Sequence, residues 1–279
     1  VRVMKKIAIM YDFDKTLCNR DMQEYSLIPA LGYDDPGRFW AEVTKLATGN
    51  KMDSILAYMY WLLNRSKAMD RPIRRSDFTE LGKDIEFFDG VETWFERINE
   101  YGKSLDLEVE HYVISSGMYE IIEGTSIMDK FRKVYACRYY YDASGIARWP
   151  ALVVNYTTKT QYIFRVNKQV LDENEDAALN TYTAPDQRPI PFGRMIYVAD
   201  GLTDVPCMKL VKEYGGKAIA VYNPAKSDEV ARKLIREGRA NYMCPSDYTK
   251  NGPMETLMKD ILSYMHDVAV LEEREGLGE

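Results

Sequence analysis

The stretch Lys6-Ile7-Ala8-Ile9-Met10-Tyr11 is almost wholly apolar and runs directly into Asp12-Phe13-Asp14. An apolar run of this length that ends in polar residues is typical of a strand buried on both faces of a parallel sheet. Three later segments repeat the pattern, because each is a short apolar run followed by polar or glycine-containing residues. They are 111–114 before Ser115-Ser116-Gly117, 194–199 before Asp200-Gly201, and 218–222 before Asn223-Pro224.

Helical patterns separate these apolar runs. Apolar residues recur at helical spacing in 91–101 and again in 205–214. Strands that alternate with helices of this length predict βαβ units, and therefore an α/β fold with a three-layer, Rossmann-like core around a central parallel sheet. Ligands of such sheets bind beyond the carboxyl ends of the strands. We therefore expect the polar residues that follow the apolar runs to lie together at that edge.

Residues 18–88 show a different pattern, with helical stretches and no strand-like run. We expect a helical cap inserted after the first strand at 18–88, so that 1–17 and 89–279 together form a discontinuous core. The tyrosine, tryptophan and methionine side chains of this segment are expected to pack between its helices. The predicted helices are 36–47, 53–64 and 77–85, the last with capping-box spacing at Asp77 and Glu80.

The remaining segments contain weaker signals. Residues 134–155 read as two strands around the turn Asp142-Ala143-Ser144-Gly145. Residues 168–192 are acidic and then proline-rich, which predicts an irregular surface excursion. A helix begins near Pro253, and 272–279 is expected to be a charged tail.

Composition excludes several classes of protein. The chain has 279 residues with 46% apolar and 29% charged side chains, as in globular proteins, and a net charge of −6 that favours neither nucleic-acid nor membrane-surface binding. No apolar run approaches the roughly 18–20 residues that span a bilayer. The four cysteines form no CxxC pair, and Asp12 interrupts the N-terminal apolar run before it reaches the length of a signal peptide. These features predict a cytoplasmic protein with reduced thiols.

The polar clusters are informative as a set. Asp12-Phe13-Asp14-Lys15-Thr16-Leu17 resembles the first motif, DxDx[TV], of the haloacid dehalogenase-like (HAD) hydrolase superfamily. Ile114-Ser115-Ser116-Gly117 resembles the second motif, Lys159 the third, and Asp200-Gly201-Leu202-Thr203-Asp204 the fourth, all in the order of the family. The segment 18–88 resembles a C1-type cap, and the phosphoserine phosphatase-like branch is the most similar.

This resemblance implies a magnesium-dependent phosphomonoester hydrolase that acts through an aspartyl-phosphate. Asp12 would be the nucleophile and Asp14 the general acid and base. Oxygen ligands suit Mg²⁺, so the Asp12 carboxylate, the Asp14 carbonyl and Asp200 would hold it, while Asp204 would orient the metal site or pair with Lys159. Further residues of the site are Lys159 and Ser115 as catalytic phosphate-holding groups, and Thr16, Ser116, Gly117, Asp21 and Glu24 as substrate-binding groups.

The substrate and several roles stay open at this point. A small phosphorylated metabolite is expected, phosphoserine or another amino-alcohol phosphate, with Asp21 and Glu24 near a substrate ammonium group. Asp21 is equally suited to capping a helix, and Ser116 stands where phosphoserine phosphatases usually have glycine. Asp204 could instead be a helix N-terminal residue that stabilises the helix dipole. Asp12, Asp14 and Asp200 could instead be plain turn residues.

Rival functions are a phosphomutase and a non-catalytic regulatory binder on the same scaffold. Dehalogenation is disfavoured because the second aspartate, Asp14, is present. Asp14-Lys15-Thr16 is also similar to the phosphorylation loop of P-type ATPases, but no transmembrane segment supports that function. His111, His266 and the basic run 71–75 are expected to have packing or surface roles.

Overall fold

The computed structural model describes residues 4–276, and within them a central sheet of seven strands organises the chain. The strand order is β4-β3-β2-β1-β5-β6-β7, with every pair parallel except β3 and β4. The Rossmann-like α/β fold expected from the sequence is confirmed. The strands are β1 (Lys5–Tyr11), β2 (Leu107–Met118), β3 (Lys133–Tyr141), β4 (Ala147–Leu152), β5 (Met195–Ala199), β6 (Lys217–Tyr222) and β7 (Tyr242–Pro245).

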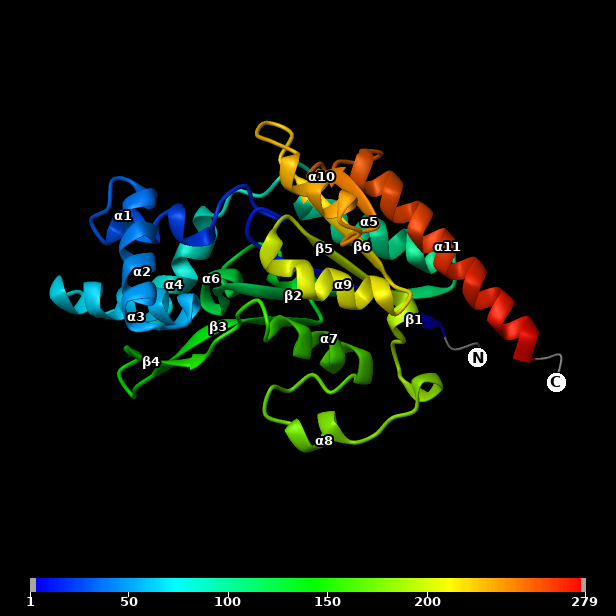
Figure 1. The fold of residues 1–279 in the computed structure, drawn as a ribbon, viewed down its shortest axis with the longest axis horizontal. Helices are drawn as coiled ribbons and strands as arrows, with labels where there is room; N and C mark the ends of the chain where they lie inside the picture. Colours follow the sequence, from blue (N-terminus) through cyan, green and yellow to red (C-terminus); the bar gives the residue numbers. More distant parts are fainter. Residues whose placement is uncertain (1–3, 277–279) are drawn as a thin grey trace.

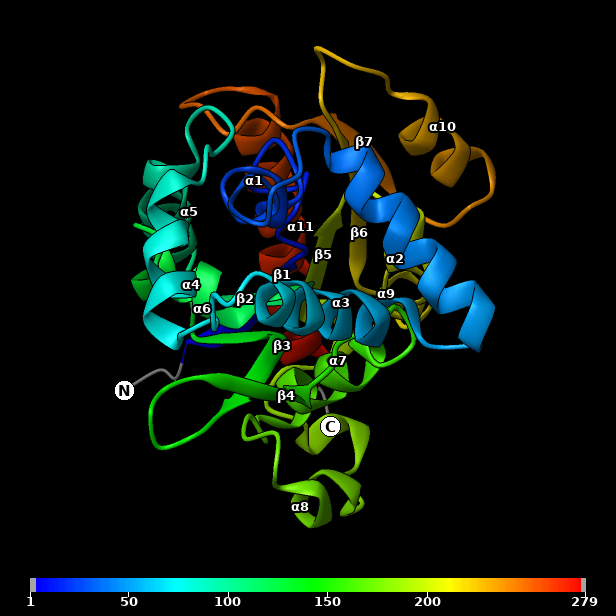
Figure 2. The same ribbon diagram turned by 90° about the vertical axis from the view of Figure 1, so that its left-hand side faces the viewer.

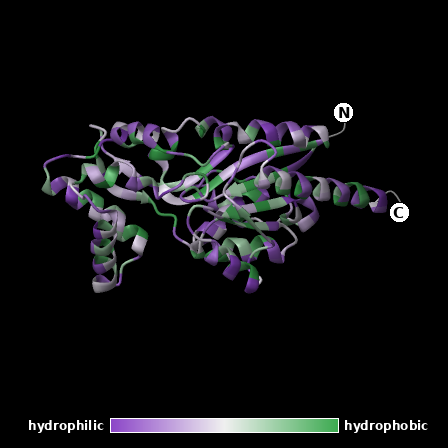
Figure 3. Ribbon diagram, turned by 90° about the horizontal axis from the view of Figure 1, so that it is seen from above, coloured by the Kyte–Doolittle hydropathy of each residue, from purple (hydrophilic) through white to green (hydrophobic). Residues whose placement is uncertain are grey.

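Helices cover both faces of this sheet, as Figures 1 and 2 show. On one face lie α5 (Val91–Ser104) and α11 (Pro253–Gly276), and on the other lie α7 (Lys159–Lys168), α9 (Val205–Glu213) and α10 (Glu229–Arg236). Hydrophobic and hydrophilic residues alternate along α11, as expected for a helix that buries one side (Figure 3). The short helices α6 (Tyr119–Glu123) and α8 (Asp176–Asn180) complete the core.

Residues 18–88 form a helical insertion at the carboxyl end of the sheet, opposite the start of β1 (Figure 1). The expected helices are present with shifted ends. The third begins at Arg75, so Asp77 lies inside its first turn and accepts from the Arg74 N–H at 2.8 Å, and Glu80 pairs with Lys83. The helices of the insertion are α1 (Leu27–Ala30), α2 (Pro36–Asn50), α3 (Ser54–Ala68) and α4 (Arg75–Leu81).

The insertion packs closely on the core at the residues that follow α4 and α6. Gly82 and Gly124 lie in this contact, and in each the missing side chain lets backbone approach backbone. A Cβ at Gly124 would overlap the Thr79 carbonyl oxygen, and one at Gly82 would overlap the carbonyl oxygen of Ile121. Only glycine fits such an approach, so this contact fixes the position of α4 against α6.

The predicted hairpin is present, and it contacts the insertion as well as the sheet. Tyr139 of β3 donates its hydroxyl to the Met59 carbonyl at 2.6 Å and stacks on Phe78 with ring centroids 5.8 Å apart. Arg74 donates to the Ser144 carbonyl of the turn at 2.7 Å. The hairpin therefore joins the core to the insertion at a place where the chain itself does not connect them.

Two predicted boundaries were wrong. The second strand does not end at Ile114, because β2 continues through Ser115-Ser116-Gly117 to Met118 after a register shift against β3. The segment 272–276 is helical, since α11 runs to Gly276 and Arg194 contacts Glu272, whereas 277–279 lie outside the described residues. All four cysteines are buried, and none forms a disulfide within residues 4–276.

Candidate active site

The strand register brings the predicted site residues to one edge of the sheet. Tyr11, the last residue of β1, lies beside Val113 of β2 on one side and Val198 of β5 on the other. The next residue, Asp12, continues the ladder by donating its N–H to the Val198 carbonyl at 2.9 Å. Asp200 and Ser115 each follow their paired residue by two positions, so both reach the carboxyl edge next to Asp12.

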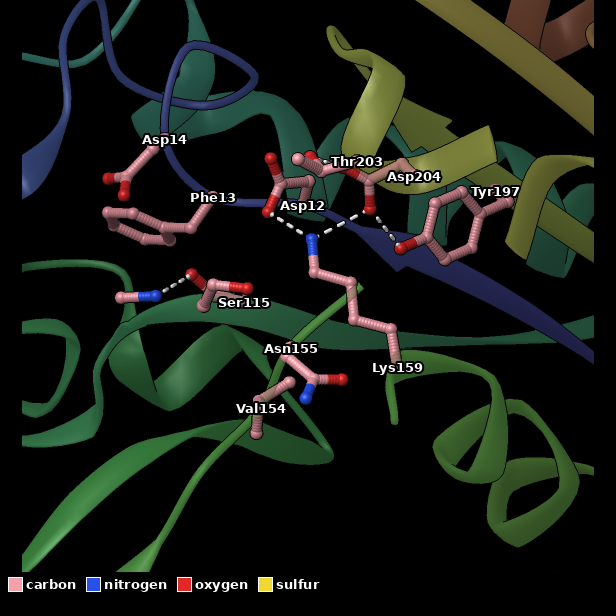
Figure 4. A network of polar contacts seen from close by, with 12 residues as sticks. Asp12, Phe13, Asp14, Ser115, Val154, Asn155, Lys159, Tyr197, Thr203 and Asp204 are labelled. Carbon is pink, nitrogen blue, oxygen red and sulfur yellow. Dashed lines mark hydrogen bonds and ion pairs between the residues drawn. The ribbon is translucent and has the colours of Figure 1, made fainter. Parts of the chain in front are cut away.

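Lys159, at the start of α7, bridges two of the carboxylates (Figure 4). Its Nζ lies 3.0 Å from Asp12 Oδ1 and 2.7 Å from Asp204 Oδ1. The side chains of Lys159 and Asp204 are 2% and 0% exposed, so this ion pair lies in the protein interior. Lys168, at the other end of α7, donates instead to the carbonyls of Leu179 and Thr181.

Both oxygens of Asp204 are occupied by protein donors. Besides Lys159, Oδ1 accepts from the Tyr197 hydroxyl at 2.6 Å, and Oδ2 accepts from the Thr203 hydroxyl at 3.1 Å. The side chain makes no capping hydrogen bond to α9. Asp204 is therefore placed to hold Lys159, as the expected pairing has it.

Asp14 faces the insertion. Its Oδ1 accepts from the backbone N–H of Met22 at 2.9 Å, so the carboxyl group lies between the first loop and the 3-10 turn Met22–Glu24. Lys15 follows Asp14 in the chain and adopts a left-handed conformation with φ of 58°. Its side chain forms an ion pair with Asp21 at 2.7 Å.

The site concentrates negative charge away from water. Burial, with help from the neighbouring Asp204 and Asp200, raises the pKa of Asp12 to about 8 although Lys159 opposes the shift. Burial and the nearby Asp21 and Asp12 raise the pKa of Asp14 well above its usual range. Burial and Asp204 raise the pKa of Asp200 to about 6. Burial opposes ionisation of Lys159, yet its two carboxylate partners raise its pKa.

This donor set fits a hard divalent cation. Asp200 makes no hydrogen bond or ion pair within residues 4–276, and the second oxygen of Asp12 makes none either. A cation between these carboxylates would relieve the repulsion that raises their pKa values. No group of three or more His, Cys, Asp or Glu side chains in the described chain is arranged around one point, so water, backbone or substrate oxygens would complete the coordination.

The segment Ser115-Ser116-Gly117 uses some of its polar groups in hydrogen bonds to the protein itself. The Ser115 hydroxyl, fully buried, accepts from the Gly117 N–H at 2.9 Å and keeps its own proton for another acceptor. The Gly117 N–H is thus occupied, and a side chain at Gly117 would overlap Met22. Ser116 uses its carbonyl to accept from the Tyr58 hydroxyl at 3.0 Å. Of the three, Ser115 is best placed to donate to a phosphate.

The remaining predicted residues have partners of their own. Thr16 is buried with no hydrogen-bond partner for its hydroxyl, while its carbonyl accepts from Tyr248 at 2.7 Å. The side chain of Asp21 makes no capping bond, because it pairs with Lys15. Glu24 accepts from the Trp40 indole at 3.2 Å. The Thr16 hydroxyl therefore makes no hydrogen bond to the loop, whereas the Tyr248 hydroxyl bonds to the loop through the Thr16 carbonyl.

Two residues that contact the predicted site were not predicted. Tyr197 and Tyr248 lie in or after apolar strands, where a tyrosine reads as core, and both are fully buried. Their hydroxyl groups nevertheless reach Asp204 and the first loop. The local sequence gives no sign of these contacts. Thr16 is far from Tyr248 along the chain, and Asp204 lies in a different element from Tyr197.

His111 and the basic run have structural roles. His111 is buried, with Tyr11 and Asn99 on its two ring nitrogens at 3.1 and 2.9 Å. Arg75 pairs with Glu123 of α6 at 2.6 Å, so the run 71–75 contacts the core, not the site. No helix within residues 4–276 is long and apolar enough to cross a bilayer.

Solved structures of a HAD family hydrolase and of phosphoserine phosphatases have a similar fold at low sequence identity. One from Salmonella enterica serovar Typhi superposes with a TM-score of 0.55 at 16% identity, covering 86% of this chain and 67% of that one. A phosphoserine phosphatase with bound substrate gives 0.51 at 16% identity, covering 86% and 92%. Another in the apo form gives 0.53 at 15%, covering 86% and 93%.

Comparison of sequences gives less information than comparison of structures. No protein-family model matches the chain. An uncharacterised protein from Borreliella burgdorferi is 26% identical over 276 residues, which covers 88% of this chain and 92% of that protein.

Proposed function

We propose that this protein is a magnesium-dependent phosphomonoester hydrolase that acts through an aspartyl-phosphate on Asp12. The observation that carries the proposal is the buried Asp12–Lys159–Asp204 bridge, with Asp14 on the same loop and Asp200 on the adjacent strand end. Phosphoryl transfer depends on positioning and on charge neutralisation, and this set of groups supplies both.

In the first step, a carboxylate oxygen of Asp12 bonds to phosphorus while the bond from phosphorus to the leaving alcohol oxygen breaks. Asp14 gives its proton to that oxygen, so the alcohol leaves neutral. Burial raises the pKa of Asp14, which favours the protonated form needed for this transfer.

In the second step, water attacks the phosphorus of the aspartyl-phosphate. Asp14, now a carboxylate, takes a proton from the water, and the bond from phosphorus to Asp12 breaks. Inorganic phosphate leaves and both aspartates return to their starting states.

The phosphate oxygens would be held by Lys159 and by the free proton of Ser115. Mg²⁺ held by the Asp12 carboxylate, the Asp14 carbonyl and Asp200 would supply positive charge between the nucleophile and the anionic substrate. Asp204 and Tyr197 position Lys159 by occupying its other side.

The substrate of this proposal is a small phosphorylated metabolite, and the site offers no reason to expect nucleic acid or a membrane as a partner. An amino-alcohol phosphate follows from the resemblance to phosphoserine phosphatases. However, Asp21 already pairs with Lys15, so it would have to exchange that partner to bind a substrate ammonium group.

Phosphate release from a panel of phosphomonoesters tests the proposal, with and without Mg²⁺, for the wild type and for Asp12→Asn. We expect release that requires Mg²⁺, stops on chelation, returns when Mg²⁺ is restored, and is abolished in Asp12→Asn. Acid quenching during turnover should trap phosphate on the wild-type chain alone.

Turnover retained by Asp12→Asn would refute the nucleophile assignment. A folded protein that hydrolyses nothing in the panel would favour a phosphomutase, tested by phosphate transfer to a second sugar hydroxyl, or a regulatory binder.

A further inference from the structure

A cleft of about 830 Å³ separates the helical insertion from the edge of the sheet. Asp14 and Ser116 lie at its core end, and α2 and α3 form its outer walls. Clefts of roughly 300–1,000 Å³ hold ligands of drug size, so this one has room for a substantial leaving group beyond the phosphate.

The walls of this cleft are largely apolar. Trp40, Val43 and Ala47 line it from one face of α2, and Ile55 and Tyr58 line it from α3. Trp40 and Tyr58 meet edge to face with centroids 5.9 Å apart. Such walls favour a leaving group with an apolar or aromatic body.

The charged residues of the cleft are already paired or peripheral. Asp21 pairs with Lys15, and Asp53 accepts from the backbone of α3 and from the Asn155 amide. Among the described lining residues there is no arginine, and the basic one, Lys51, is exposed at the end of α2. The carboxylate of an amino acid phosphate therefore finds no basic partner inside the cleft, and its ammonium group would have to share acidic side chains that already have partners.

Gln23 provides the polar contact that remains. It lines the cleft, is 2% exposed, and its side-chain oxygen has no hydrogen-bond partner. Tyr58, which also lines the cleft, donates its hydroxyl to the Ser116 carbonyl. These contacts leave a buried acceptor that a donor on the ligand would satisfy.

We propose that this cleft selects phosphomonoesters whose leaving alcohol is uncharged and apolar or aromatic, with a hydrogen-bond donor for Gln23. This inference rests on the proposed hydrolase function and names its substrate class. It departs from phosphoserine and other amino-alcohol phosphates.

Matched alkyl esters test the inference, because their leaving oxygens have similar reactivity. We expect kcat/KM for 2-phenylethyl phosphate to exceed that for phosphoethanolamine and phosphoserine by about 10–100-fold. A hydroxyl group on the phenyl ring, at position 3 or 4, should raise kcat/KM further in the wild type but not in Gln23→Leu. Higher kcat/KM for phosphoserine, phosphoethanolamine or phosphocholine than for the phenyl ester would overturn the inference while the hydrolase function stands.

Variants locate the selectivity in the cleft. Trp40→Ala should lower the ratio of kcat/KM for 2-phenylethyl phosphate to that for phosphoethanolamine by about 10-fold or more. Trp149→Ala, at an exposed position on β4 outside the cleft, is the matched control and should leave the ratio unchanged. Thr44→Arg, at an exposed position on α2 that lines the cleft, should shift the ratio toward phosphoserine. An unchanged ratio in both Trp40→Ala and Thr44→Arg would refute the assignment.

Binding without turnover separates this inference from the proposed function. Saturation-transfer NMR should detect 2-phenylethanol on the metal-free wild type and a weaker signal on Trp40→Ala. If no phosphomonoester is hydrolysed but this difference is found, the proposed function fails and the apolar specificity stands. If neither 2-phenylethanol nor the phenyl ester is recognised, the specificity fails whatever the activity.

Discussion

The sheet edge and the helical insertion differ in how their charged side chains are partnered. At the edge, Lys159 and Asp204 are 2% and 0% exposed, and each bonds to the other and to further groups. In the insertion, Lys83 and Glu80 form an ion pair while 65% and 70% exposed. Exposed pairs contribute about 0–1 kcal/mol, whereas breaking a buried pair leaves a charge that water cannot reach.

This difference between buried and exposed ion pairs indicates which parts of the molecule tolerate substitution. The edge depends on each member of its charge set, because removal of one leaves the others buried without compensation. The insertion depends instead on where its helices contact the core, as at Gly82 and Gly124. Two substitutions probe this contrast, Lys159→Met with the larger expected effect and Gly124→Ala with the smaller, and a pH dependence from the buried core follows them.

Lys159→Met should produce the largest effect, on both stability and turnover. It leaves Asp12 and Asp204 buried without a cation, which costs about 3–5 kcal/mol of unfolding free energy. It also removes a group that would hold phosphate, so turnover should fall by about 10²-fold or more. Urea denaturation and phosphate release measure the two effects.

Lys209→Met is the matched control, since Lys209 is exposed on α9. It should change unfolding free energy by less than about 0.5 kcal/mol. Adding Asp204→Asn to Lys159→Met should recover part of the lost stability by removing one uncompensated charge. Stability unchanged in Lys159→Met would contradict the buried ion-pair description.

Gly124→Ala tests the contact between the insertion and the core. The added methyl group would overlap the Thr79 carbonyl, so we expect a loss of about 1–3 kcal/mol in unfolding free energy. Gly49→Ala, in α2 with open space around it, should instead stabilise by up to about 1 kcal/mol. Thermal or urea unfolding measures the stability of both variants. Equal changes in unfolding free energy would mean that the close backbone approach at Gly124 is absent.

His111 should make stability depend on pH. Burial lowers its pKa to about 3, and its neutral ring accepts from Tyr11 and donates to Asn99. Between this value and about 6.5, the unfolded chain binds the extra proton, so stability falls as pH drops. From pH 8 to pH 5 the histidine should account for about 2 kcal/mol of lost unfolding free energy.

Urea denaturation at the two pH values measures this effect. His111→Gln should show a correspondingly smaller loss between pH 8 and pH 5, whatever its stability at pH 8. His266→Gln, at the other histidine of the chain, is the comparison variant. Identical pH dependence in His111→Gln and the wild type would argue against a neutral buried ring.

Much of the fold follows from local sequence. Apolar runs such as Ile7–Tyr11 and 195–199 become central strands because no polar residue interrupts them. Boundaries were less predictable. Ser115 and Ser116 read as a turn, yet they continue β2 because β3 extends beside them and the Tyr58 hydroxyl satisfies a carbonyl there. That partner lies in the insertion, which local sequence does not reveal.

The candidate site divides in the same way. Asp12, Asp200 and Lys159 were predictable because each follows a strand or opens a helix at the sheet edge. Gln23 and Tyr197 were not, since their significance arises only from what the fold places beside them. The pairing of Asp21 with Lys15 likewise depends on the left-handed turn at Lys15.

The hairpin contact described above also bears on exchanging parts between relatives. Tyr139 bonds and stacks against the insertion, and Ala147 of β4 donates its N–H to the Ile73 carbonyl at 2.8 Å. A chimera that receives only residues 18–88 would present foreign helices to this hairpin and lose both contacts. The transferable unit is therefore the insertion together with the β3–β4 hairpin, two separate stretches of chain that must be compatible for either to fit.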